Sequence, residues 1–485
     1  MSDLASTDAG GGASLIGYLA GTVKSFLDSL ATDIGASLIR YKASFTGAVQ
    51  RTLSDVFEDE VNSAWFAPDR TGATDASAAL QKALDAAAGR SLTIRPGTYL
   101  LGSALAVSSN TKINAHGCTF NRSGTANNLL RNKADGVTGG YNASSNITML
   151  GGTWDSTTGT GDCTVLAFGH CTNVTIRDVT INNINNWHHI ELNGCYNATV
   201  ENGYFSGGNV TTYAGNNEAI QIDSMIDSAG FPWFGPYDNT ICQTIRVLHC
   251  TFSNVGSGVG THTATTSINH NSIVVDKCYF KGVWSSAVKG LTWSDVKVTH
   301  CKFDTMACAV IFLQNPTGRL NNDIYICDNT ITAIGTVNPT DSRGIWLIGT
   351  TGQACSNVTI ANNHLLAFNG ANQTHGIATE YAQNMTIANN TISQSNQIGI
   401  YVFGGSYISV TGNMAGACQY DYRFGNTGVA NTLTKFTATG NIGDIATISY
   451  GQKCFVRGNN FGTSFANASM TSSDVTGNLV AGVVV

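Results

Sequence analysis

The pattern that decides the fold is clearest in NVTIANNHL (357–365) and NMTIANNTI (384–392). In both segments polar and apolar residues alternate, turn-forming residues follow, and an apolar residue closes the segment. Alternation rich in Val, Ile and Thr predicts a short strand that ends in a tight bend. Most copies lie 23 to 28 residues apart, which is too short for strand–helix–strand units. Further copies are NVTIRDVTI (173–181), NATVENGYF (197–205), SIVVDKCYF (272–280), DVKVTHCKF (295–303), DIYICDNTI (323–331) and YISVTGNMA (407–415).

A second strand is predicted between successive copies. Examples are WHHIELN (187–193), NEAIQID (217–223) and HGIATEY (375–381). Two short strands per repeat, with no helix between them, predict an all-β chain that winds into a parallel β-solenoid.

One column of residues tests the register of this solenoid. Equivalent residues of stacked coils lie about 4.8 Å apart, so Asn amides can hydrogen-bond along the stack. Small Cys side chains fit the same slot, and without CxxC spacing they do not indicate a metal site. The column contains Cys250, Cys278, Cys301, Asn329, Asn363, Asn390, Asn413, Asn441 and Asn459.

The composition excludes several classes of protein. Only 12% of the 485 residues are charged and the net charge is -6, which argues against a nucleic-acid-binding body. No apolar run reaches 18 residues, so no membrane insertion is expected, and no secretory signal is visible at the start. We expect the 13 Cys to be reduced, buried thiols.

The first hundred residues carry a family resemblance. GASLIGY (12–18) recurs as GASLIRY (35–41), and this repeat resembles the N-terminal segment of bacteriophage tailspike proteins. The run TGATDASAALQKALDAAAGRSLTIRPGTYLL (71–101) resembles the opening of pectate-lyase-like β-helix proteins. We therefore expect a small helical adaptor for virion attachment over 1–64, a β-helix over 65–470 with a capping helix near 75–88, and a C-terminal tail over 471–485.

The resemblance implies a right-handed parallel β-helix that works as a homotrimer and degrades bacterial surface polysaccharide, either capsule or O-antigen. It places the protein in the virion tail, attached to the phage tail or baseplate, assembled in the host cytoplasm and acting at the bacterial surface. No cofactor and no metal are expected. The active-site motifs of pectate lyases and polygalacturonases are not evident, so the chemistry must be argued from the residues.

Outward-facing polar residues of the second strand predict a functional ridge. If Ile and Leu point inward, their neighbours point outward on four consecutive coils, over roughly 15 Å. This length suits an oligosaccharide lying along the solenoid. The predicted ridge contains His189, Glu191, Gln221, Asp223, His262 and Lys289.

A long insertion beside this ridge contains FPWFGPY (231–237). Long loops on a rigid scaffold are commonly functional. Trp233 and Tyr237 offer flat faces for sugar rings, although the same rings would also serve to fasten the loop to the coil.

Glycosidic hydrolysis needs two carboxyl groups. We expect Glu218 and Asp223 to carry catalysis, with Glu191 as third choice. Partial burial would raise the pKa of Glu218 and suit it to the acid role, leaving Asp223 as the base. A lyase is the alternative, with His262 and Lys289 supplying base and positive charge. A glycan-binding adhesin and a secreted pectinolytic enzyme also remain open.

Further along the chain the outward column becomes apolar. We expect Ile311, Leu313, Trp346, Ile348, Tyr401 and Phe403 to face outward. Large outward apolar residues need covering, either by a threefold interface or by sugars in an aromatic groove that includes Trp346. Glu380 lies in this stretch as a weaker catalytic candidate.

Overall fold

The structure is a computed structural model. It describes residues 25, 28–29, 39–208, 217–226, 228, 231–264, 268–306, 308–314, 321–334, 342–350, 353–368, 374–425, 433–449, 451–470 and 472–485. The GASLIGY segment and most of the expected adaptor lie outside the described residues.

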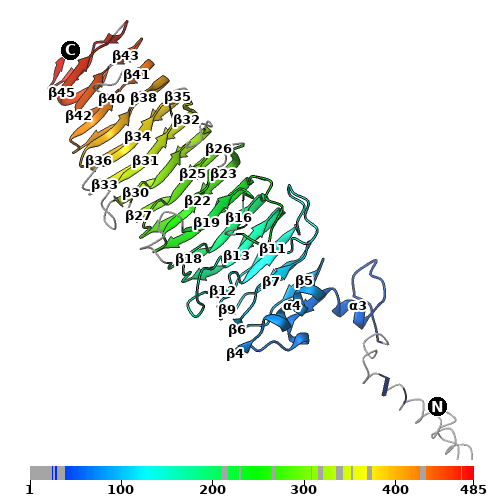
Figure 1. Ribbon diagram of the computed structural model, residues 1–485. Coiled ribbons are helices and arrows are strands. Elements are labelled where there is room, and N and C mark those ends of the chain that lie inside the picture. The colour runs from blue at the N-terminus through cyan, green and yellow to red at the C-terminus, as the bar shows by residue number, and fades with distance from the viewer. Residues whose placement is uncertain are drawn as a thin grey trace, which may run out of the picture.

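Successive coils of the chain stack into one long parallel solenoid (Figure 1). Each strand pairs in parallel with the equivalent strand of the next coil. The parallel β-helix predicted from the repeats is confirmed. Two successive coils are β14 (Thr172–Arg177), β15 (Thr180–Asn182) and β16 (Ile190–Asn193), then β17 (Tyr196–Glu201), β18 (Tyr204–Ser206) and β19 (Glu218–Asp223).

Each of these coils has three strands rather than the two expected, because the residues after the bend form a short strand of their own. We name the resulting sides the first, second and third faces, after β14, β15 and β16. The third face comprises β10 (Leu130–Asn132), β13 (Leu166–Gly169), β16, β19, β22 (Ser257–Gly260), β25 (Val288–Leu291), β28 (Ile311–Gln314), β31 (Arg343–Ile348), β34 (His375–Glu380), β37 (Ile398–Val402) and β40 (Tyr420–Phe424).

The bend between the first and second faces holds a ladder of buried Asn side chains, as the sequence predicts. Asn363 donates from Nδ2 to Asn390 Oδ1 at 2.9 Å, and Asn390 donates in the same way to Asn413 at 2.9 Å. The ladder continues through Asn441 and Asn459. The residue before each Asn has a left-handed backbone, such as Asn362 at φ 58° and Asn389 at φ 56°. These bonds satisfy buried amides in every turn and fix the register of the coils.

The interior of the solenoid is filled by stacked apolar side chains. Phe205, Phe252, Phe280 and Phe303 are all buried, and the ring centroids of neighbours lie 4.5 to 5.1 Å apart. The cysteines are free thiols, most of them buried. This continuous core makes the outer faces a rigid support for side chains that act on a ligand.

The two ends of the solenoid differ. At the N-terminal end, α4 (Ser77–Ala86) buries Leu80 and Leu84 against the first coils. At the C-terminal end, β47 (Leu479–Val480) pairs in parallel with β45 (Asn460–Ala468), and Asn478 continues the ladder. The expected boundary at residue 470 therefore lies inside the solenoid.

Among the described residues, no helix is long and apolar enough to cross a membrane.

Candidate active site

The third face brings the predicted polar residues together on consecutive rungs. In β16, β19, β22 and β25, Glu191 aligns with Gln221, Gln221 with Gly260, and Gly260 with Lys289. Asp223 follows Gln221 at the end of β19 and aligns with Asn193.

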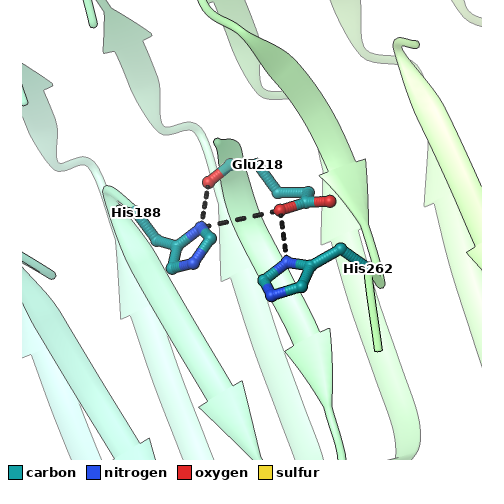
Figure 2. Close-up of side chains that lie close together, drawn as sticks. All are labelled: His188, Glu218 and His262. Atoms are coloured by element: carbon teal, nitrogen blue, oxygen red, sulfur yellow. Dashed lines mark hydrogen bonds and ion pairs between the residues drawn. The ribbon is translucent and has the colours of Figure 1, made fainter. Parts of the chain in front are cut away.

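Glu218 lies at the centre of this group, at the start of β19. Figure 2 shows its carboxylate between the rings of His188 and His262. His262 Nδ1 lies 3.0 Å from Glu218 Oε2, and Lys289 Nζ lies 3.7 Å from Oε1. His188 Nδ1 donates to the main-chain oxygen of Glu218 at 2.9 Å. The side chain passes close to Gly260, where an added Cβ would lie 3.0 Å from Glu218 Cγ and 3.0 Å from the Lys289 main-chain oxygen, so a larger residue there would have to displace these groups.

The protonation state of Glu218 differs from the one expected. Burial alone would raise the pKa of Glu218, but the hydrogen bond and charge of His262, together with Lys289, lower it to about 2. Burial would lower the pKa of His262, but its contact with Glu218 raises it to about 9. The two groups form an ion pair at neutral pH. Glu218 is therefore an unsuitable general acid, contrary to the expectation from burial.

The raised pKa values belong to the other two carboxyl groups. Burial raises the pKa of Glu191 to about 8, with a smaller contribution from the charge of Asp223. Thr164 Oγ1 and Asn193 Nδ2 hold the Glu191 oxygens at 2.8 and 2.9 Å. Burial also raises the pKa of Asp223, to about 7, although the charge of His262 opposes this rise. Neighbouring carboxyl groups whose pKa values are raised toward neutrality are suited to act as a general acid and a general base.

The carboxyl groups of this site are almost enclosed, whereas His262 is partly accessible to solvent. Glu191 and Asp223 each retain 4% of their surface, and the His262 side chain retains 25%. Gln221 Nε2 donates to Asp223 Oδ2 at 2.7 Å, whereas Asp223 Oδ1 has no hydrogen-bond partner among the residues that the structure describes. This oxygen is itself buried, and a buried acceptor without a partner favours the protonated form of the carboxyl group.

A metal ion is a poor match for this cluster. His188, Glu218 and His262 offer ligand atoms within 4.8 Å of one another. However, His188 Nδ1 and His262 Nδ1 already contact oxygens of Glu218, and the Lys289 ammonium lies beside the same carboxylate. These contacts describe an ion-pair network instead of a metal centre.

One predicted ridge residue is wrong, and its neighbour was missed. His189 is fully buried, with Nε2 3.2 Å from the Ser206 carbonyl oxygen and the ring packed edge-on against Phe205, so it cannot contact a surface glycan. Strand alternation does not extend to His189, because β16 begins only at Ile190. His188 takes the site position instead. The matching of the two predicted strands pointed to His188. Ile190 of β16 pairs with Ile220 of β19, and His188 and Glu218 each lie two residues before these paired Ile residues.

The aromatic loop fastens itself to the coil on the N-terminal side of Glu191. Phe231 and Phe234 are buried and stacked at 4.3 Å over β13, where Gly169 has no room for a Cβ. Tyr237 donates its hydroxyl to the Phe231 carbonyl at 3.0 Å. The Tyr237 hydroxyl thus helps to fasten the loop, while its half-buried ring leaves the expected sugar contact as a prediction. Trp233 is only partly buried, with Arg131 5.7 Å above its ring.

On β28 the outward residues differ by one position from the expectation, whereas Ile348, Tyr401 and Phe403 lie on the outward side as expected. Ile311 and Leu313 are completely buried in the core, and Phe312, paired with Lys289, faces outward. The length of the preceding loop reversed the alternation. Trp346 does face outward, in register with Phe312, and lies two rungs or about 10 Å from Lys289.

Comparisons with known proteins identify the fold. No protein-family model matches the chain, and no curated protein sequence matches it. Among solved structures, a tailspike variant of E. coli bacteriophage HK620 in complex with a pentasaccharide is similar at TM-score 0.61 and 14% identity, over 92% of this chain and 84% of that one. The chain has the fold of tailspike proteins.

Two other solved structures share this fold. Tailspike protein 3 of bacteriophage CBA120 matches at TM-score 0.56 and 16% identity, over 95% of this chain and 68% of that one. The Streptococcus pneumoniae surface protein and adhesin PfbA matches at TM-score 0.56 and 18% identity, over 87% of this chain and all of that one. At such identities the likeness defines the fold, and the chemistry must come from the site.

Proposed function

We propose that this chain is a tailspike depolymerase that cleaves bacterial surface polysaccharide internally, by glycosidic hydrolysis. The observation that carries the proposal is the pair Glu191 and Asp223 on neighbouring rungs of the third face, where burial raises their pKa values to about 8 and about 7. The fold shared with a tailspike that was solved with a pentasaccharide supports a polysaccharide substrate.

In the proposed reaction Glu191 is the acid and Asp223 is the base. Protonated Glu191 donates its proton to the glycosidic oxygen as the bond from that oxygen to the anomeric carbon breaks. Ionised Asp223 removes a proton from the water that attacks the anomeric carbon, or attacks the carbon itself. Gln221 fixes Asp223, and the Glu218–His262 ion pair keeps positive charge beside it. Glu218 is thus a positioning residue.

The proposal includes the assembly and location that the N-terminal resemblance implies. We place the chain in a homotrimer in the virion tail, joined to the tail or baseplate through the N-terminal segment, and acting at the bacterial cell surface. Substrate contacts are assigned to Gln221, Trp233, His262, Lys289 and Trp346, which all lie on the third face or beside it.

A lyase is the second candidate because two cations lie within this site. Lys289 and protonated His262 would neutralise a sugar carboxylate and stabilise the enolate of β-elimination. Because His262 is protonated, ionised Asp223 would remove the proton beside the sugar carboxylate, and Glu191 would protonate the leaving oxygen as the double bond forms.

Product analysis tests the proposed function. Capsular and O-antigen polysaccharides from a panel of bacteria are incubated with the protein, and chain length, reducing ends and ultraviolet absorbance are followed. We expect rapid shortening of one polysaccharide, with one new reducing end per cut and no new absorbance. New absorbance from a carbon–carbon double bond would replace the hydrolase with the lyase. Binding without any shortening would leave only an adhesin.

The pH profile of cleavage should be bell-shaped, with its maximum between about 7 and 8. Activity requires ionised Asp223, which is present above its pKa of about 7, and protonated Glu191, which is present below its pKa of about 8. The measurement is kcat/KM against pH on a purified polysaccharide. If kcat/KM did not change between pH 5 and pH 9, a range that includes both pKa values, Asp223 and Glu191 would be excluded as the titrating groups.

A further inference from the structure

The loop of residues 156–162 is built around one fully buried cation, Arg122. This residue ends β9 (Cys118–Arg122) and exposes none of its surface. It forms no ion pair with any carboxylate that the structure describes, where the ion pairs of arginine all involve other arginines. Its guanidinium donates instead to the main-chain oxygens of Ala126, Thr160, Gly161 and Asp162, at 2.5 to 3.0 Å. Because a buried charge is costly unless it is hydrogen-bonded, these bonds determine where the loop can lie.

Arg122 joins this loop to a second one, and the two loops meet at Thr164. Asp162 ends the first loop, whereas Ala126 lies in the second, in the segment after β9. The Thr164 main-chain nitrogen donates to the Asn127 oxygen at 2.9 Å. Each partner of this bond therefore lies within two residues of an oxygen that Arg122 holds.

Thr164 in turn contacts Glu191. Its hydroxyl donates to Glu191 Oε2 at 2.8 Å, and both side chains are almost completely buried. Burial raises the pKa of Glu191 to about 8, while the Thr164 hydrogen bond opposes this rise because it stabilises the ionised form. The position of Thr164 therefore affects both the orientation and the protonation of Glu191.

We propose that Arg122 is a positioning residue for cleavage, which keeps Thr164 in contact with Glu191 by holding the 156–162 loop. This inference rests on the proposed function, in which Glu191 is the acid. Because Arg122 is enclosed, it does not touch the polysaccharide and acts only through Thr164.

An arginine is specifically suited to this position. A guanidinium offers five N–H donors in one plane, whereas a lysine offers three donors on a single atom. The wider donor set serves oxygens of two loops at once. The 156–162 loop also closes on the side chain at Gly159, where an added Cβ would lie 2.3 Å from Arg122 Cδ.

The test measures the pKa of Glu191 by carbon-13 NMR titration of the full chain labelled at the Glu carboxyl carbons, with Glu191→Gln to identify the signal. Arg122→Gln should raise this pKa above about 8, because Thr164 no longer donates to the ionised carboxylate. Thr164→Val should raise it to the same extent. In the Thr164→Val background, Arg122→Gln should have no further effect, because the two residues act in series.

Cleavage provides the second measurement. Arg122→Gln should lower kcat by about 10²-fold with little change in KM, and should move the basic limb of the pH profile to higher pH. Gly159→Ala, which crowds Arg122 without removing it, should give the same pattern more weakly, and it replaces Arg122→Gln if that variant does not fold. Arg70→Gln is the matched control, because Arg70 donates to the Pro96 carbonyl at the N-terminal end of the solenoid, and it should change neither quantity.

Two outcomes would overturn the inference. The first is an unchanged or lowered pKa of Glu191 in Arg122→Gln and in Gly159→Ala. The second is an equal rise on adding Arg122→Gln to Thr164→Val, which would show that the charge of Arg122 acts on Glu191 directly. Failure of the proposed function would look different, because the pKa of Glu191 would respond as expected while no polysaccharide is cut.

Discussion

Glu191→Gln and Asp223→Asn should each lower kcat/KM for polysaccharide cleavage by about 10³-fold. Each substitution keeps the size and hydrogen-bonding shape of the side chain but removes the proton donor or the proton acceptor. Both side chains are almost enclosed and held by neighbouring hydrogen bonds, so the amides should fit the same positions. The measurement is initial rate of new reducing ends, with binding of uncut polysaccharide followed separately.

Glu201→Gln is the matched control, because this carboxylate lies on the first face, and the rate should not change. Glu218→Gln separates positioning from proton transfer. It should lower the pKa of His262 from about 9, which NMR titration detects, whereas Glu191→Gln should lower it much less, because Glu218 is the main partner of His262. Full activity in both Glu191→Gln and Asp223→Asn would reject this pair as the catalytic groups.

Asn390→Ala should lower the free energy of unfolding by about 4 kcal/mol. The change removes the bond from the Asn390 amide to the Ile360 carbonyl and the bonds that its oxygen accepts from the main chain and side chain of Asn363. The Asn363 N–H and the Ile360 carbonyl are then buried without partners, and each such group costs about 1–3 kcal/mol. Equilibrium denaturation of the full chain measures the loss.

Two variants control this experiment. Asn390→Cys should lose less, because Cys301 fills the equivalent slot and its sulfur accepts from the Cys278 main-chain nitrogen at 3.5 Å. Asn389→Gly alters the neighbouring left-handed position, where later coils have Gly412 at φ 63°, and should cost little. A loss in Asn390→Ala no larger than that in Asn389→Gly would show that the ladder does not stabilise the bend.

The fold was predictable because its determinants are local and repeated. Alternation in NVTIANNHL defines a strand, and the Asn that follows it marks the same bend from Asn329 onward, so the stacking of Asn363, Asn390 and Asn413 followed from the sequence. Strand alternation could not reveal the additional short strand on the second face, because a three-residue segment such as Thr180–Asn182 is too short to show a pattern.

The site was predictable only where alternation held. Glu191, Gln221 and Lys289 lie inside strands, and their alignment followed from the inward Ile and Leu residues. The predicted orientations of His189 and Leu313 were wrong, because the length of the preceding loop determines the residue at which strand alternation begins. The acid and base roles depend on charges from other coils, such as His262 beside Glu218, and such contacts are not encoded in any one segment.

The asparagine ladder also determines what this architecture tolerates. Ladder partners are separated by 18 residues between Asn441 and Asn459 but by 34 between Asn329 and Asn363, yet both amide bonds measure 2.9 Å. Extra residues are therefore accommodated between bends without disturbing the rungs. Such a scaffold lets the segments beside the third face differ in length and sequence from coil to coil, while the spine of the molecule stays the same.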